Sequence, residues 1–233
     1  EDEVQIWLMP FLTPNRVREF YPEEKINSYE DAVRVVLEHS PLNPEKINLL
    51  IAHQFITGGQ TSEEEFAVGG LDNISAELFR EFDYVALGHI HASYAVGRES
   101  VRYAGSPMCY HFDELRQPKK GPLLVELGAK GTEPLIETLT IPPLHPMHEL
   151  RGTDDELRVK ASAVEGGAYV KLVLTDRPMT PEISAYYQAL FESRGSVLME
   201  RQSEYRRFTD VQDTSESQDL QDKSVEELFA QFY

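Results

Sequence analysis

The sequence predicts an α/β protein that consists of two units, and three observations predict it. Short apolar runs typical of buried strands alternate with segments that carry helix-start signals. A proline-rich stretch, residues 141–146, interrupts this alternation and is typical of an extended linker at a domain boundary. Beyond it the order helix, strand, helix, strand follows, which predicts a compact second α/β unit.

Three apolar runs and two helix starts make up the first part of the chain. The runs that we expect to form strands are residues 4–9, 47–52 and 84–87. Ser28 and Asp31 are spaced as a capping box, which predicts a helix that begins after Ser28 and runs through Leu37. Ser75 is expected to cap a short helix that reaches Arg80.

After residue 88 the pattern changes to short strands separated by turn residues. The expected strands are residues 94–96, 101–104, 123–127 and 135–141, and they predict an antiparallel meander. In the second unit we expect helices at 154–161 and 182–193 and strands at 168–174 and 197–201. The predicted divisions of the chain are residues 1–141, residues 142–209, an acidic linker at 210–222 and a terminal helix at 223–233.

Composition narrows the class of protein. The 233 residues are 41% hydrophobic, and no apolar run approaches the length of a transmembrane helix, so we expect no membrane partner. The single cysteine, Cys109, rules out an internal disulfide and agrees with a reducing compartment, which predicts a cytoplasmic protein. The formal net charge of −18 argues against DNA binding by this chain alone, although many acids lie toward the tail.

Three histidines follow predicted strands. Gly88-His89-Ile90-His91 comes directly after the apolar run 84–87, and residues two apart on an extended segment project to the same side. His53 closes the run 47–52. Imidazole is the commonest neutral metal ligand near pH 7, so His53, His89 and His91 are the candidate metal ligands. A pair of histidines at this spacing also occurs as a strand cap, and the short motif alone does not decide between the two.

The surrounding residues carry a family resemblance. Residues 48–59, Asn-Leu-Leu-Ile-Ala-His-Gln-Phe-Ile-Thr-Gly-Gly, resemble the fourth metal-binding motif of the SbcD-type DNA exonucleases. Residues 85–91, followed by Arg102-Tyr-Ala-Gly-Ser-Pro107, resemble their fifth motif and the strand and turn after it. These enzymes are calcineurin-like metallophosphoesterases. The resemblance implies the carboxyl-terminal half of a metallophosphoesterase β-sandwich with flanking helices, followed by a small α/β DNA-capping domain.

The chain departs from the family pattern in three places. Such enzymes begin with Asp-x-His, Gly-Asp-x-x-Asp and Gly-Asn-His-Asp/Glu blocks, and none of these occurs in this sequence. We therefore expect the chain to be the carboxyl-terminal part of a longer nuclease, with an incomplete metal site and no activity by itself. No residue of this chain is assigned a catalytic role, and the three histidines are assigned only as metal ligands.

The resemblance also implies a chemistry and partners. It implies two divalent metal ions, with manganese as the metal, one held by His53 and His89 and the other by His91. The implied activity is 3′-to-5′ exonuclease and endonuclease hydrolysis of DNA phosphodiesters, in DNA repair, recombination and replication. The implied assembly is a homodimer that works with an SbcC-type ATPase.

Other polar residues are expected to serve structure or partners. His39, His145 and His148 are predicted to be structural, and His111 is predicted to have a structural or surface role, with approach to the substrate groove as the alternative. The second unit offers arginines that either contact DNA phosphates or are ordinary surface residues: Arg177, Arg194, Arg201, Arg206 and Arg207. Ser224 and Glu227 are spaced as a capping box, and an apolar stripe follows, so we expect a helix that docks on the ATPase, with folding back onto the second unit as the alternative.

Two other classes of function remain open from the residues. One is a metallophosphoesterase that acts on small phosphodiesters or phosphoproteins, because the Gly-His-x-His block is shared across the superfamily. The second is a non-catalytic scaffold that keeps part of a ligand set. Intact amino-terminal motif blocks in the complete gene would distinguish a nuclease from a scaffold. The second unit distinguishes a nuclease from a small-molecule phosphatase, which would not need such a unit.

Overall fold

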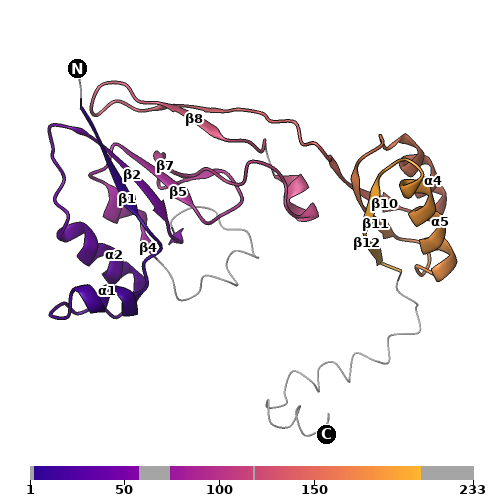
Figure 1. Cartoon of the computed structure of the whole chain (residues 1–233), viewed down its shortest axis with the longest axis horizontal. Coiled ribbons are helices and arrows are strands. Elements are labelled where there is room, and N and C mark those ends of the chain that lie inside the picture. The colour runs from indigo at the N-terminus through magenta and orange to yellow at the C-terminus, as the bar shows by residue number, and fades with distance from the viewer. Residues whose placement is uncertain (1–2, 58–73, 118, 206–233) are drawn as a thin grey trace, which may run out of the picture. The chain divides into compact units, whose positions relative to one another are not determined.

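The computed structural model describes residues 3–57, 74–117 and 119–205 (Figure 1). The chain divides into two compact units, Glu1–Leu144 and His145–Tyr233. Helices and strands are mixed in both units, so the predicted α/β class is confirmed. Over the described ranges, no helix combines the length and the apolar character that crossing a membrane requires.

A five-stranded sheet forms the centre of the first unit (Figure 1). Its strands lie in the order β1-β2-β5-β7-β6, with the bounds β1 Val4–Met9, β2 Ile47–His53, β5 Tyr84–Gly88, β7 Arg98–Tyr103 and β6 Tyr94–Val96. The first four are parallel, and β6 is antiparallel to β7. Because the carboxyl ends of parallel strands lie at the same edge of a sheet, the residues that follow β2 and β5 lie close together at that edge.

One face of this sheet packs against two helices, α1 (Pro14–Phe20) and α2 (Tyr29–Glu38). Fully buried strand residues such as Leu50 and Val85 form one apolar cluster with the helix residues, among them Val33. The alternation of buried and exposed positions in β1 and β2 gives this face its apolar side chains. Burial of this cluster is the main stabilising term for the unit.

The helix starts follow local capping chemistry. Ser28 Oγ accepts the N–H of Asp31 at 3.0 Å, and the Asp31 carboxylate accepts the N–H of Ser28 at 3.2 Å, which confirms the predicted capping box. Ser75 caps the next helix as predicted, but this helix is a 3₁₀ turn, η1 (Ala76–Phe79). The prediction omits α1, although Thr13 accepts the N–H of Arg16 at its start.

The predicted antiparallel meander is wrong in its connections. Strand β7 lies parallel to β5, while β8 (Leu123–Glu126) and β9 (Leu135–Thr138) form a separate two-stranded antiparallel sheet. Turn residues mark where strands end but do not specify which neighbour each strand joins, and this is why the sequence misleads here. A further two-stranded parallel pair joins β3 (Ile56–Thr57) to β4 (Ile74–Ser75).

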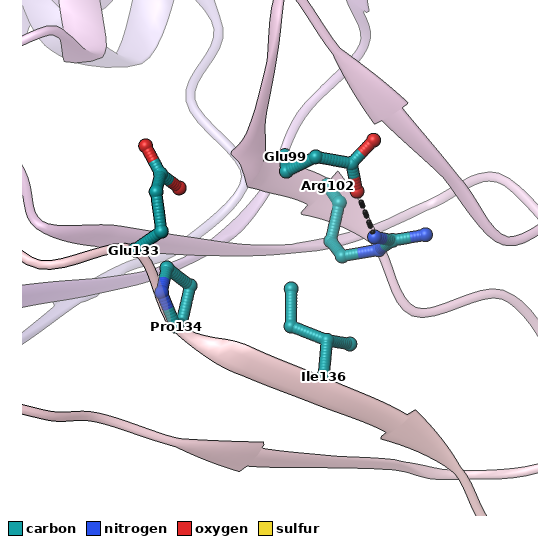
Figure 2. Close-up of a pocket in the computed structure, with 5 residues that line it drawn as sticks. All are labelled: Glu99, Arg102, Glu133, Pro134 and Ile136. Carbon is teal, nitrogen blue, oxygen red and sulfur yellow. Dashed lines mark hydrogen bonds and ion pairs between the residues drawn. The ribbon is translucent and has the colours of Figure 1, made fainter.

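A pocket of ≈ 370 Å³ lies between β7 and the β8–β9 hairpin (Figure 2). Its lining is Glu99, Arg102, Glu133, Pro134 and Ile136. Figure 2 shows the Arg102 guanidinium joined to Glu99, at 2.7 Å. With two carboxylates and one paired guanidinium, this lining does not suit a phosphate group.

The second unit is a three-stranded parallel sheet with two helices. Its elements are β10 (Met147–Gly152), α4 (Asp154–Ala163), β11 (Tyr169–Leu174), α5 (Pro181–Glu192) and β12 (Val197–Ser203). The strands lie in the order β10-β11-β12. Both helices contribute to one buried cluster with alternate residues of β11, so they pack on the same face of the sheet.

The predicted helices and the strands at 168–174 and 197–201 are confirmed within a few residues. The prediction omits β10, which begins close behind the proline-rich linker. The acidic linker at 210–222 and the terminal helix at 223–233 lie outside the described residues.

Candidate metal centre

His53 and His89 meet at the carboxyl ends of two neighbouring parallel strands. His53 is the last residue of β2 and lies opposite Gly88, the last residue of β5. His89 follows directly, and its ring lies edge-on to that of His53, with 5.4 Å between the ring centroids. Both residues are exposed, so these neighbouring imidazoles can be reached from solvent.

Gly88 makes room for the His53 ring. A Cβ atom at position 88 would lie 2.8 Å from His53 Nδ1, which is closer than two such atoms can approach without a shift. The glycine therefore lets the imidazole lie directly over the backbone of β5. This is a packing reason for the glycine, in addition to the bend that the sequence suggests.

The backbone of His89 is strained. Its φ is +107°, a value that side chains with a Cβ rarely adopt, and among the described residues other than glycine it is the one with positive φ. Phe11, which follows β1 in the sequence, stacks on the His89 ring with 6.3 Å between the ring centroids. Phe55, which follows β2, lies edge-on to the same ring with 6.2 Å between the centroids. Strain of this kind costs about 1–3 kcal/mol and persists where the surroundings hold the residue, most often at functional sites.

Tyr103 anchors the segment that follows His53. Its side chain is fully buried, its hydroxyl oxygen accepts the N–H of Ile56 at 2.7 Å, and its O–H donates to the carbonyl of Gln54 at 2.9 Å. These hydrogen bonds tie residues 54–56 to β7, which lies on the far side of β5. The chain that leaves His53 is thereby fixed from within the core.

His91 takes a different environment from the other two histidines. Its Nδ1 lies 2.8 Å from the carboxylate of Glu114, which belongs to the 3₁₀ turn η2 (Phe112–Arg116). Ile90, between the two histidines of the motif, is buried and holds the loop against the core. Lys120 Nζ donates to the carbonyl of His91 at 2.7 Å.

Glu114 is a buried carboxylate with a full set of donors. Burial raises the pKa of this carboxyl, but hydrogen bonds from Lys120, His91 and the Tyr110 N–H, together with the Lys120 charge, outweigh it and bring the pKa down to about 2. Glu114 is therefore ionised at neutral pH. Its contacts with residues 91, 106 and 120 stabilise the loops around the histidine motif.

The side chains at this edge of the sheet supply part of the donor set that a metal ion needs. The described ranges hold no group of three or more histidine, cysteine or acidic side chains arranged to bind a metal. They do bring His53 and His89 together, and two imidazole nitrogens fit part of the coordination shell of manganese, iron or zinc. His91 meets a carboxylate through Nδ1, and a carboxylate is a usual hydrogen-bond partner for the free nitrogen of a metal-bound histidine.

The remaining histidines differ in their surroundings. His39 is the C-cap of α2, where its Nδ1 lies 2.9 Å from the carbonyl of Val35. His111 is the exposed N-cap of η2. His145 Nδ1 lies 2.8 Å from the carbonyl of Gly167. His148 lies in β10, half-buried.

The arginines proposed for DNA contacts differ in their surroundings. Arg177 pairs with Asp176 at 2.8 Å, and Arg201 donates to the side-chain oxygen of Gln188. Arg194 donates to the carbonyls of residues 161 and 162 at the end of α4, which is a structural task. Arg206 and Arg207 lie outside the described residues.

Two residues of the site, Glu114 and Lys120, were not predicted from the sequence. Both lie far along the chain from His91, and both come from stretches without strong periodicity. A histidine and a carboxylate 23 positions apart have no spacing signal that would join them. Only the fold shows that they meet.

Comparison with known proteins adds three findings. Residues 143–233 match the SbcD carboxyl-terminal family model, described as the Type 5 capsule protein repressor C-terminal domain. The SbcD component of the nuclease SbcCD from Staphylococcus epidermidis is 34% identical over 151 residues, which cover 63% of this chain and 39% of that protein. The protein of the same name from Staphylococcus saprophyticus is 32% identical over 152 residues, with the same two shares. The chain thus spans about two fifths of the length of these relatives, and the similarity that the motifs predicted is confirmed.

Proposed function

We propose that this chain, which is similar to the SbcD component of the nuclease SbcCD, forms the carboxyl-terminal part of a metal-dependent DNA nuclease. The reaction is hydrolysis of phosphodiester bonds, by exonuclease and endonuclease cleavage, in DNA repair, recombination and replication. The observation that carries the proposal is the pair of imidazoles, His53 and His89, at the shared edge of parallel strands. That edge is where open α/β sheets place their ligands.

The residues of this chain would hold two divalent ions, with manganese as the metal. His53 and His89 would bind one ion, and His91 would bind the other. Bound ions of this kind activate a water molecule and neutralise the charge that develops on the phosphate. The protein positions the ligands: Gly88 leaves space for the His53 ring, and Phe11 and Phe55 pack against the ring of His89.

The five-stranded sheet supports the finer fold, one layer of a metallophosphoesterase sandwich. Its four parallel strands have helices packed on one face, whereas parallel sheets are normally covered on both. On the other face, β1 exposes Ile6 by 60% and Leu8 by 75%, and Ile51 of β2 is also exposed. An apolar face of this kind suits a second packed layer, supplied by other residues of the nuclease.

The second unit would serve as the DNA-capping domain, and the partners would be DNA, a second copy of the nuclease and an SbcC-type ATPase, in the cytoplasm. The net charge of −18 means that DNA affinity has to come from bound metal ions and from the partners. The terminal helix at 223–233 would bind the ATPase through its apolar stripe.

Alanine substitution in the complete nuclease, which joins this sequence to the three amino-terminal motif blocks, tests the proposal. With linear duplex DNA and manganese, His53→Ala, His89→Ala and His91→Ala should each abolish cleavage while the fold is retained. His39→Ala and His145→Ala are the matched controls and should keep cleavage close to wild type, since both rings contact structural carbonyls. Equal activity in all five variants would contradict the ligand assignment.

The same assay separates the alternatives. Cleavage of small phosphodiesters or phosphoproteins without cleavage of DNA would favour a general metallophosphoesterase. Absence of any hydrolysis with retained binding to the ATPase would favour a scaffold.

A further inference from the structure

The contact between Glu114 and His91 joins a buried carboxylate to a half-exposed imidazole. The carboxylate is 6% exposed, and its Oε1 lies 2.8 Å from Nδ1 of a histidine whose own side chain is 48% exposed. A half-exposed imidazole obtains hydrogen bonds from water without help. Burial of the Glu114 charge costs free energy, and Lys120 and the Tyr110 N–H offset that cost at Oε2, so the contact between Oε1 and the imidazole calls for a reason of its own.

The carboxylate is also held in one orientation. Its Oε2 accepts hydrogen bonds from Ser106 Oγ at 3.3 Å and from the N–H of Tyr110 at 3.2 Å, and it pairs with Lys120 Nζ at 2.9 Å. Lys120 donates in addition to Ser106 Oγ at 2.8 Å and to the His91 carbonyl at 2.7 Å. With Oε2 fixed by three donors, Oε1 has a fixed direction, and that direction is toward the imidazole.

This geometry decides which ring nitrogen carries the proton. An ionised carboxylate can only accept, so Nδ1 of His91 must be the donor. In the neutral ring the other nitrogen, Nε2, then has the free lone pair. A metal ion needs that lone pair, and carboxylates that fix it in this way are the usual outer partners of metal-bound histidines.

We propose that Glu114 is a positioning residue for His91: it fixes the ring and its tautomer so that Nε2 faces a metal ion. The inference rests on the proposed function and deepens it. Lys120 and Ser106 are the groups that hold Glu114 in place, and they connect the turn at residues 105–107 to the histidine motif.

The test begins with the tautomer of His91 in the 233-residue chain itself, without metal. Long-range ¹H–¹⁵N correlation spectra, recorded at a pH where the ring is neutral, distinguish a protonated Nδ1 from a protonated Nε2. The histidine signals that disappear from the spectrum of the His91→Gln variant are those of the His91 ring. We expect a predominantly protonated Nδ1, and a predominantly protonated Nε2 would overturn the proposal whatever the variants do.

Glu114→Gln then tests the cause. The amide oxygen should turn to the Lys120 cation, which leaves the NH₂ group to face Nδ1, so the proton should move to Nε2. Asp113→Asn, the neighbouring exposed position of η2, is the matched control and should leave the tautomer unchanged. Retention of protonated Nδ1 in a folded Glu114→Gln variant would overturn the proposal.

Manganese affinity of the complete nuclease, followed by the electron paramagnetic resonance of free manganese, separates this inference from the proposed function. Glu114→Gln should weaken binding by about 10- to 100-fold, and Asp113→Asn should not change it. Wild-type affinity in Glu114→Gln would overturn the positioning role while the nuclease proposal stands. A tautomer that depends on Glu114 in a protein that binds no manganese would support the geometry and contradict the proposed function.

Discussion

Removal of the Tyr103 hydroxyl should destabilise the first unit and loosen the chain behind His53. In Tyr103→Phe, the N–H of Ile56 and the carbonyl of Gln54 lose their hydrogen-bond partner within the core. Each buried backbone group without a partner costs about 1–3 kcal/mol, and a carbonyl is the less costly of the two. We therefore expect a loss of about 2–4 kcal/mol in the free energy of unfolding.

Denaturant unfolding followed by tryptophan fluorescence measures the free energy of unfolding of the first unit. The chain has a single tryptophan, Trp7, and it lies in β1 and packs against the core of the first unit. Tyr21→Phe is the matched control because it deletes the same atom from a residue at the same core, where no hydrogen bond joins the hydroxyl to another described residue. The control should change the free energy by less than about 0.5 kcal/mol. An equally small effect of Tyr103→Phe would refute the anchoring role.

Three further predictions concern pH, the metal pair and the partner. Burial raises the pKa of the Asp83 carboxyl, but hydrogen bonds from the N–H of residue 48 and from Lys130 outweigh burial and lower the pKa. The ionised carboxylate therefore stabilises the folded state above about pH 3.9, and this stabilisation is lost as the pH falls through the folded pKa. Asp83→Asn should cost about 1.5–3 kcal/mol at neutral pH and flatten the acid side of the stability curve; an unchanged curve contradicts this. Gly88→Ala should displace the His53 ring and reduce cleavage by the complete nuclease about 100-fold, while circular dichroism shows a retained fold; full activity contradicts the packing role. Deletion of the residues after Asp222 should weaken capture of the SbcC-type ATPase in a pull-down and spare the thermal stability of the second unit; unchanged capture contradicts the docking helix.

The strands that carry His53 and His89 could be predicted because apolar residues dominate both runs. Alternate residues such as Leu50 and Val85 are buried, and each run ends in a glycine or histidine that breaks the pattern. The capping box of α2 could also be predicted, since it depends on side chains three residues apart. Local chemistry of this kind is present in the sequence itself.

Elements with weak periodicity could not be predicted in the same way. Strand β10 reads Met-His-Glu-Leu-Arg-Gly, in which the two large apolar residues, Met147 and Leu150, are three positions apart and do not show the alternation of a strand. The pairing of β7 with β5 depends on which strands meet in space, and the turn residues between them do not encode it. For the same reason Glu114 and Lys120 were invisible as partners of His91, because their chemistry depends on loops that only the fold brings together.

Anomalous X-ray scattering at the manganese edge, from crystals of the complete nuclease, tests whether the three histidines bind metal. We expect a manganese peak within bonding distance of ring nitrogens of both His53 and His89, and a second peak at Nε2 of His91. Manganese peaks bound elsewhere, with the rings of His53 and His89 free of metal, would contradict it.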